Sequence, residues 1–220
     1  MSDEFQNVLA IDTAMSGCSA CVLKGTELFS RSEDMPRGQA VHLVPMINDV
    51  IAKAGLNHGD LDAVVTTNGP GAFTGLRIGL STAKAMAMAL GVPVFGVTTL
   101  QALALSYVDE AEGAFTALVE TRREEFYAQS FDVQGGATCE VTLVRVDEIE
   151  DAPAFIGDGA VRFKSLRSEA SIAKGFELPN VGVMARALID APSLFTRDPA
   201  AVYLRGADVS VSKKIQRTIA

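Results

Sequence analysis

The chain has 220 residues, of which 48% are hydrophobic and 21% are charged, a composition typical of a globular protein and not of a disordered one. Nineteen Lys and Arg against 27 Asp and Glu give a formal net charge of -8, which disfavours a protein that holds a nucleic-acid backbone unaided. The N-terminal residues lack the features of a signal peptide and no apolar run is long enough to span a membrane, so we expect a cytoplasmic protein.

The first third of the chain predicts three strands at 7–11, 18–23 and 27–32, joined by tight turns as an antiparallel meander. Asp12 and Thr13 follow the first strand, where an acidic residue and a hydroxyl can meet a phosphate or its magnesium. The alternative is that Asp12 only caps the turn. Cys18 and Cys21 form a lone C-x-x-C, which we interpret as two buried thiols on opposite faces of a strand.

A first helix is predicted over 40–54, with Gly55 as its C-terminal cap and Pro45 marking either a kink or a later start. The residues expected on its apolar face are Val41, Val44, Ile47, Ile51 and Ala54. His42, Met46 and Asp49 lie off that stripe. We interpret His42 as a surface or interface residue because no nucleophile or acidic partner stands at a catalytic spacing from it.

The central stretch, residues 68–103, combines a glycine-rich loop, a helix over 73–90 that Gly91 caps, a strand over 94–97 and a third helix over 99–108. The central helix is apolar nearly all round. Gly75, Gly79, Ala83 and Ala87 recur every four residues, and Thr82, Ala85 and Ala89 form a second small stripe. Two interpretations stay open: a crossover helix buried within one domain, or a helix that also forms an interface with a second subunit.

Gly69 and Gly71 follow the strand predicted at 62–67, as in loops that bind phosphate at a helix N-terminus. However, neither G-x-x-x-x-G-K-[ST] nor G-x-G-x-x-G is present. We therefore favour a structural turn and keep Asp12, Thr13, Gly69 and Gly71 as candidate nucleotide-binding positions. Two histidines, sixteen residues apart, are too few for a dedicated metal site.

The second half resembles the first in order but is degenerate. It predicts strands at 115–120, 126–131, 141–146 and 154–156, helices at 160–166 and 181–190, and a loop between Pro192 and Pro199. Basic residues cluster in the last sixteen residues, at Arg205, Lys213, Lys214 and Arg217.

Six segments, in chain order, resemble the TsaB (YeaZ) family: AIDTA, HLVPMINDVIAKAG, NGPGAFTGLRIGLSTAKAMAMALGVPVFGVTTLQALA, ETRREEFYAQSF, GDGA and VYLR. The resemblance covers nearly the whole chain. It implies the α/β fold of actin, sugar kinases and heat-shock ATPases, with two βββαβα-type halves. We expect a first subdomain at 1–105, completed by 203–220, and a smaller degenerate one at 106–202.

The resemblance also implies a role in making threonylcarbamoyladenosine next to the anticodon of tRNA. The transferase of that pathway is TsaD, with TsaE as an ATPase and TsaC or a relative as the source of the activated threonylcarbamoyl group. The two metal-binding histidines of TsaD fall here at Thr99 and Leu103. The resemblance thus implies a pseudoenzyme with no catalytic residue, metal or cofactor of its own, so that ATP, ADP and metal belong to partner subunits.

In the family, the first two long helices bind TsaD and also form a homodimer when the protein is alone. Carried onto this chain, that surface is His42, Val44, Pro45, Met46, Asp49, Arg77, Ile78, Ser81, Thr82 and Ala85. We expect tRNA to be reached through the complex, with Lys213, Lys214 and Arg217 as candidate contacts. The alternative function is an ATPase or a glycoprotease-like hydrolase that acts alone through Asp12 and the glycine-rich loop.

Overall fold

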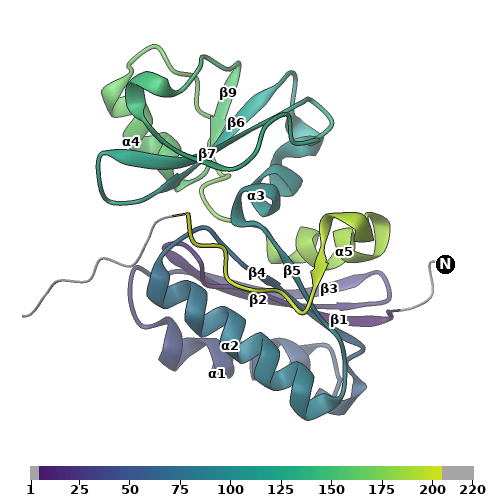
Figure 1. Ribbon diagram of the computed structural model, residues 1–220. Helices are drawn as coiled ribbons and strands as arrows, with labels where there is room; N and C mark the ends of the chain where they lie inside the picture. Colours follow the sequence, from purple (N-terminus) through teal and green to yellow (C-terminus); the bar gives the residue numbers. More distant parts are fainter. Residues whose placement is uncertain (1–4, 205–220) are drawn as a thin grey trace, which may run out of the picture.

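Two β-sheets organise the chain in the computed structural model, which describes residues 5–204 (Figure 1). The first sheet has the strand order β10-β5-β4-β1-β2-β3, and the second has the order β8-β7-β6-β9. Together they give the mixed α/β actin-like architecture that the sequence predicts. Within the described residues, no helix is long and apolar enough to cross a membrane.

The first sheet begins with the predicted antiparallel meander of β1 (Asn7–Asp12), β2 (Gly17–Lys24) and β3 (Glu27–Asp34). β4 (Ala63–Thr67) and β5 (Val94–Val97) add to β1 in parallel. Parallel pairing requires a crossover, and α2 (Phe73–Leu90) supplies it between β4 and β5. β10 (Thr196–Arg197) pairs antiparallel with β5 at the sheet edge.

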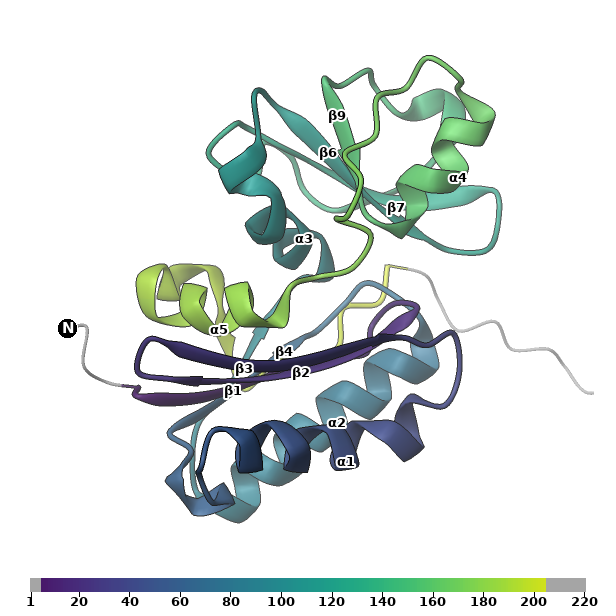
Figure 2. The ribbon, with the colours of Figure 1, turned by 180° about the vertical axis from the view of Figure 1, so that it is seen from behind.

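Helices cover both faces of the first sheet (Figure 2). α1 (Gln39–Lys53) and α2 pack on one face, and α5 (Val181–Asp190) packs on the other. Each face has its own apolar core. Cys18 belongs to the core under α1 and α2, and Cys21 belongs to the core under α5, so the interpretation of two buried thiols on opposite faces is confirmed.

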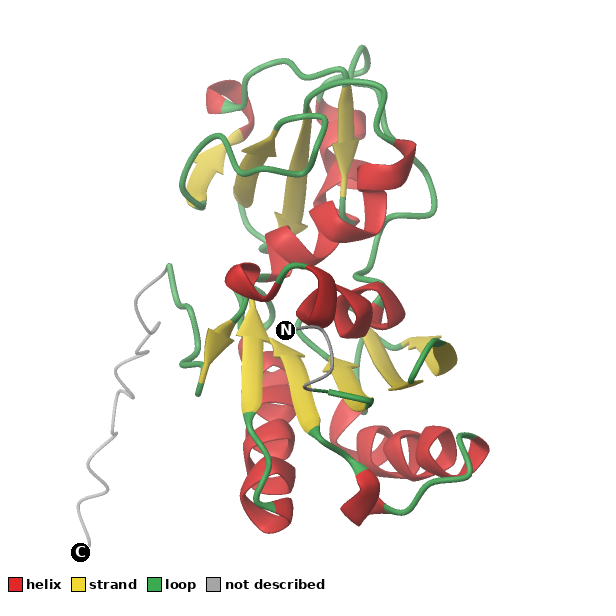
Figure 3. Cartoon of the chain, turned by 90° about the vertical axis from the view of Figure 1, so that its right-hand side faces the viewer, coloured by secondary structure: helices red, strands yellow, loops and turns green. Residues whose placement is uncertain are grey.

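The second sheet consists of β6 (Phe115–Glu120), β7 (Glu125–Phe131), β8 (Thr142–Arg145) and β9 (Ala154–Ile156). α4 (Asp158–Leu166) covers one face, and α3 (Thr99–Tyr107) packs between the second sheet and α5 (Figure 3). Short 3₁₀ helices span His58–Asp60, Val108–Glu110, Val146–Glu148 and Pro192–Leu194.

The central helix α2 has one buried and one uncovered side. Gly75, Gly79, Ala83 and Ala87 are buried toward the sheet, where small side chains let the backbones approach. Gly91 ends the helix in the left-handed conformation at φ 71°, as predicted. The second small stripe stays exposed or half-buried within the described residues. The buried-crossover interpretation is therefore right for one side of α2, and the interface interpretation of the exposed side stays a prediction.

The apolar face predicted for α1 is partly wrong. Val41 and Val44 are 74% and 51% exposed, whereas Met46 is only 1% exposed and lies in the core. The buried stripe is Leu43, Met46, Ile47, Val50 and Ile51, which follows the i, i+3, i+4, i+7 rule once Leu43 is taken as its start. The helix begins at Gln39, one residue before the predicted start and six before Pro45, so a later start, one of the two alternatives for Pro45, is excluded.

The predicted subdomain boundary at residue 202 is wrong as well. α5 contacts β1 and β2, and β10 pairs with β5, so both elements complete the first sheet and not the second. The physical reason is that the apolar side of β1 and β2 needs a second cover, and α5 provides it with Val181, Met184 and Leu188. Most of the predicted closing segment, 203–220, lies outside the described residues.

Candidate functional site

The turn after β1 and the glycine-rich loop before α2 lie in direct contact. The Ala72 N–H donates to the Ala14 carbonyl at 2.7 Å, and the Thr13 hydroxyl donates to the Gly75 carbonyl at 2.7 Å. A Cβ atom on Gly71 would lie 2.3 Å from the Ala14 carbonyl oxygen, and one on Gly75 would lie 2.0 Å from that of Thr13. The glycines thus allow two backbone segments to touch, which is the structural-turn interpretation.

Asp12 is an internal residue of this junction. Its side chain is 1% exposed, accepts a hydrogen bond from the Thr67 hydroxyl at 2.5 Å and another from the Ala14 N–H at 3.2 Å. Burial raises the pKa of the Asp12 carboxyl above its ordinary value, although these hydrogen bonds oppose the shift. Asp12 therefore holds the turn together, as the capping alternative predicted.

Thr13 and Gly69, two other candidate nucleotide-binding residues, are also buried or hydrogen-bonded within the chain. Thr13 is 1% exposed, and the Gly69 carbonyl accepts from the Thr99 N–H at 2.9 Å. The structure thus places Asp12, Thr13, Gly69 and Gly71 on the two turns that meet here, and nucleotide binding by them stays a prediction. A ligand would reach Asp12 or Thr13 only if the two turns separated.

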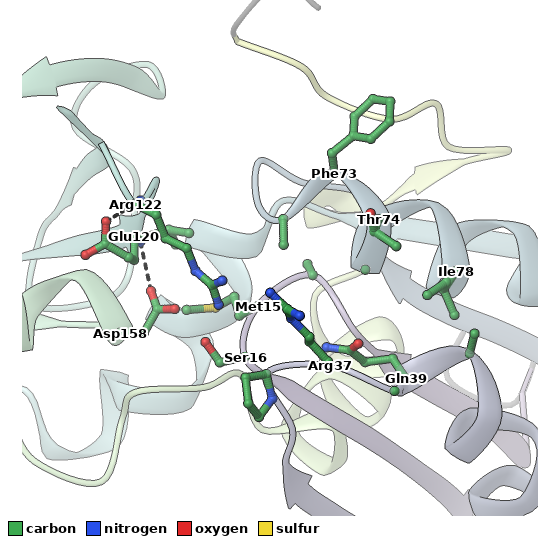
Figure 4. Close-up of a pocket in the computed structure, with 17 residues that line it drawn as sticks. Met15, Ser16, Arg37, Gln39, Phe73, Thr74, Ile78, Glu120, Arg122 and Asp158 are labelled. Carbon is green, nitrogen blue, oxygen red and sulfur yellow. Dashed lines mark hydrogen bonds between the residues drawn. The ribbon is translucent and has the colours of Figure 1, made fainter. Parts of the chain in front are cut away.

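A cavity of 490 Å³ lies beside this junction, between the two subdomains (Figure 4). Its near wall is the turn after β1 with the first residues of α1 and α2, and its far wall comes from β6, the turn after it and α4. The labelled lining residues include Met15, Ser16, Arg37, Gln39, Phe73, Thr74, Ile78, Glu120, Arg122 and Asp158. Arg37 and Arg122 both extend into the space between the walls (Figure 4).

The far wall of the cavity carries the carboxyl groups of Glu120 and Asp158. Asp158 accepts a hydrogen bond from the Glu120 N–H at 2.9 Å, and burial raises the pKa of its carboxyl to about 6. Glu120 is paired with Arg162 at 2.6 Å. Sequence reasoning missed Arg37, Glu120 and Asp158, although GDGA, which contains Asp158, was among the segments of the family resemblance.

The outer face of α1 and α2 contains most of the predicted partner residues. His42, Val44, Pro45, Arg77, Ser81 and Ala85 are exposed, and Asp49, Ile78 and Thr82 are half-buried. Met46 does not belong there because its side chain lies in the core. Val41 and Met88, which are 74% and 83% exposed, were missed. We define the α1–α2 surface as the predicted partner residues other than Met46, together with Val41 and Met88.

The two positions aligned with the metal histidines of the transferase lie inside the core. Thr99 and Leu103 are both fully buried, and Leu103 packs in the cluster that joins α3 to β6. Neither side chain is a usual zinc or iron ligand. Lys213, Lys214 and Arg217, the candidate tRNA contacts, lie outside the described residues.

Comparison with known proteins gives consistent matches. The family model of TsaD, described as tRNA N6-adenosine threonylcarbamoyltransferase, matches residues 33–219. The TsaB protein of Buchnera aphidicola from Schizaphis graminum is 38% identical over 97 residues, which are 44% of this chain and 46% of that protein. TsaB of Escherichia coli is 35% identical over 97 residues, 44% of this chain and 42% of that protein. The alignments thus span less than half of each of these two relatives.

Longer matches extend over most of the chain. An uncharacterised protein of Mycobacterium tuberculosis is 33% identical over 166 residues, 74% of this chain and 76% of that protein. The structure of YeaZ from Pseudomonas aeruginosa superposes with a TM-score of 0.78 at 25% identity, covering 90% of this chain and 99% of that one. With the TsaD family model spanning most of the sequence, and with TsaB and YeaZ proteins among its relatives, the chain belongs to the TsaB (YeaZ) family.

Proposed function

We propose that this protein is a non-catalytic scaffold subunit of the machinery that makes threonylcarbamoyladenosine in tRNA, and that it binds the transferase TsaD through the α1–α2 surface. The TsaB names of its relatives and the TsaD family model support a role in this pathway. In the proposal, TsaE and a TsaC-type enzyme act with the complex, and ATP, ADP and metal are held by those partners.

The observation that carries the proposal is the uncovered outer side of α1 and α2. Val41, Val44 and Met88 expose 74%, 51% and 83% of their area, and no other described element packs over them. Large apolar side chains exposed on two neighbouring helices favour a contact with a partner protein. A standard interface buries about 1,600 Å² in total, and two helices on each partner supply an area of that order. The small residues of α2 allow a facing helix to approach closely.

The interior of the chain supports the non-catalytic part of the proposal. Where the family alignment puts the histidines of the transferase, this chain buries Thr99 and Leu103. The acidic residue nearest the glycine-rich loop, Asp12, is committed to hydrogen bonds with Thr67 and Ala14. The chain therefore contributes its surface to the reaction and leaves the chemistry to TsaD.

Arginine substitutions on α2 test the proposed interface. Ala85→Arg and Thr82→Arg place a bulky charge in the contact, and we expect binding to TsaD to weaken by about 100-fold or more, with threonylcarbamoyl transfer lost in parallel. Ser165→Arg, on the exposed side of α4, is the control and should bind normally. Binding constants come from calorimetry, and transfer is measured with purified TsaD, TsaE, TsaC and tRNA.

Unchanged TsaD binding by both α2 variants would contradict the proposed surface. Equal transfer with and without this chain would contradict the scaffold role. Because the alternative is an ATPase or hydrolase that acts alone, ATP turnover by the purified chain is measured in parallel. We expect none, and turnover that disappears in Asp12→Ala would favour the alternative.

A further inference from the structure

The exposed side of α2 carries two cations and no acid. Arg77 and Lys84 are the only charged residues of this helix, and both side chains are exposed. Because they are seven residues apart, they lie on the same side of α2, about 10 Å from each other along its axis. Neither makes an ion pair with any residue in the range 5–204. A largely apolar helix of an acidic protein thus presents two positive charges on its outer side.

These cations belong to a regular row of exposed residues along α2, which crosses the front of the molecule in Figure 1. The positions in this row alternate steps of three and four residues. We call the row the outer stripe of α2, and its members, all exposed, are Thr74, Arg77, Ser81, Lys84 and Met88. Alternating steps of three and four are the spacing at which one helix packs lengthwise against another. The outer stripe is therefore suited to a facing helix.

Contacts within the chain fix the direction of the Arg77 side chain. Its guanidinium lies 3.8 Å from the centroid of the Phe73 ring, and its Nε–H donates to the Tyr203 hydroxyl at 3.4 Å. The two rings also contact each other, with centroids 5.5 Å apart. The Nη groups donate to no described residue, and they can bind a carboxylate. A guanidinium held in this way loses little conformational entropy when a carboxylate binds it.

The elements packed against α2 offer no free carboxylate to these cations. α2 packs on α1, β1, β4 and β5, and the acids on these four elements are Asp12 and Asp49. Asp12 is buried and accepts a hydrogen bond from Thr67. Asp49 is paired with Lys53 at 2.8 Å and with Arg31 at 3.5 Å. Among the described residues, nothing therefore neutralises the outer stripe.

A second copy of this chain is a poor match for the outer stripe. In a two-fold dimer the same surface of both copies meets, so two facing stripes bring together four cations and no acid. The acid that α1 of the second copy could offer, Asp49, already shares its carboxylate with Lys53 and Arg31. Like charges opposite each other in an interface are strongly unfavourable, and a cation covered without a carboxylate loses its hydration without compensation.

We propose that the outer stripe of α2 selects a partner helix that carries two carboxylates about two turns apart, one opposite Arg77 and one opposite Lys84, and that these cations disfavour pairing of the chain with itself. The small side chains of Thr74 and Ser81 let the facing helix approach closely. This inference rests on the proposed function, which makes that helix part of TsaD. It adds the charges that the facing helix requires and a physical reason for preferring the heterodimer over the homodimer.

Charge reversal in the full chain tests the proposal. For the double variant Arg77→Glu with Lys84→Glu, we expect calorimetry to show TsaD binding weakened by about 30-fold or more. Lys84→Glu alone should give part of this loss, and it breaks no hydrogen bond or ion pair among the described residues. The control combines Lys174→Glu with Arg186→Glu, which change the net charge equally at exposed positions outside α2. This control should bind TsaD like the parent protein.

Self-association of the chain is measured in parallel by sedimentation equilibrium. The double variant Arg77→Gln with Lys84→Gln removes the like charges, so we expect it to form dimers about 10-fold more tightly than the parent. A mixture of the parent with the double Glu variant brings opposite charges together in one interface. This mixture should associate more tightly than either protein alone.

TsaD binding by the double Glu variant that equals binding by the control would overturn the proposal. Equal self-association of the parent and the double Gln variant would overturn it as well. Either result leaves the scaffold role intact as long as the parent binds TsaD and Ala85→Arg weakens that binding, so the two hypotheses fail separately. If the parent itself does not bind TsaD, the proposed function is wrong and this inference is wrong with it.

Discussion

Asp158 shows how a half-buried carboxyl in the cavity wall affects the stability of the protein. It stands in the first turn of α4 and accepts the Glu120 N–H, and burial raises its pKa to about 6 from an ordinary value of 3.8. Between these two values the folded protein binds a proton that the unfolded chain has released. The free energy of unfolding contributed by Asp158 therefore falls as pH rises from about 4 to about 6.

We predict that Asp158→Asn removes this pH dependence. The neutral amide oxygen still accepts the Glu120 N–H, so the native contact is kept while the titration is lost. A shift of about two units corresponds to about 3 kcal/mol at neutral pH. The urea midpoint of the variant, compared with the parent between pH 4 and pH 8, should show a gain at neutral pH that vanishes near pH 4. Asp12, whose pKa is also raised, titrates in both proteins, so only their difference reports Asp158. Parallel pH profiles would contradict the assignment.

The close contact between the two turns predicts a strong effect of a single methyl group at Gly75. A Cβ there would lie 2.0 Å from the Thr13 carbonyl oxygen, and because that atom is backbone, neither side can move away cheaply. We expect Gly75→Ala to lower the free energy of unfolding by about 3 kcal/mol. Gly59→Ala is the matched control, because nothing lies within 4 Å of its added Cβ. Thermal denaturation of both variants measures the difference, and similar melting temperatures would mean that the turns are not packed as described.

At the scale of elements, the orientation of α1 separates two neighbouring apolar residues that sequence reasoning had exchanged. Met46 is 1% exposed within the core, and Val44 is 51% exposed on the α1–α2 surface. We predict that Met46→Ala lowers the free energy of unfolding by about 2 to 5 kcal/mol, because it leaves a cavity. Val44→Ala should change it by about 0.5 kcal/mol or less. Urea unfolding decides the point, and an equal loss in the two variants would mean that α1 is rotated.

Elements with local signals were predicted well. The bounds of α2, β5, β6, β9 and α5 agree with the sequence expectation. Gly91, at φ 71°, marks the end of α2, and a proline stands directly before β5 and before β9. The face that α1 buries was predicted less well, since only the sheet decides which of two apolar stripes is covered. β10 was missed because two residues carry no periodicity, and their strand exists only through pairing with β5.

The candidate site was predictable only in part, because part of it depends on contacts between distant segments. The contact between Asp12 and the glycine-rich loop follows from adjacent parallel strands, β1 and β4, whose carboxyl ends meet at one edge of the sheet. The cavity, by contrast, brings Arg37, Phe73 and Asp158 together from three helix starts. Phe73 also contacts the ring of Tyr203, which is far away in the sequence. No local sequence pattern indicates a site that is assembled from such distant segments.

At the scale of the whole molecule, the C-terminal part of the described chain ties the two subdomains into one folding unit. The chain leaves the first sheet through α3, builds the second sheet, and returns with α5 and β10 to the first (Figures 1 and 2). Val181, Met184 and Leu188 are at most 3% exposed in the core that α5 forms with the first sheet. Each buried side chain of this size contributes about 1.5 to 3 kcal/mol, which is large against the stability of an ordinary domain.

Because α5 and β10 pack on the first sheet, we can predict which strands a C-terminal truncation destabilises. A chain ending at Pro179 lacks α5 and β10, so we expect amide hydrogen exchange to accelerate most in β1 and β2, whose apolar side loses its cover. β6, which keeps α4, and β7, whose Phe126 ring contacts Phe163 of α4, should retain more protection even though they are nearer in sequence to the cut. The control is a chain ending at Leu204, which keeps both elements. Faster exchange confined to β6 and β7, with β1 and β2 protected as in the control, would mean that residues 181–197 stabilise the second subdomain after all.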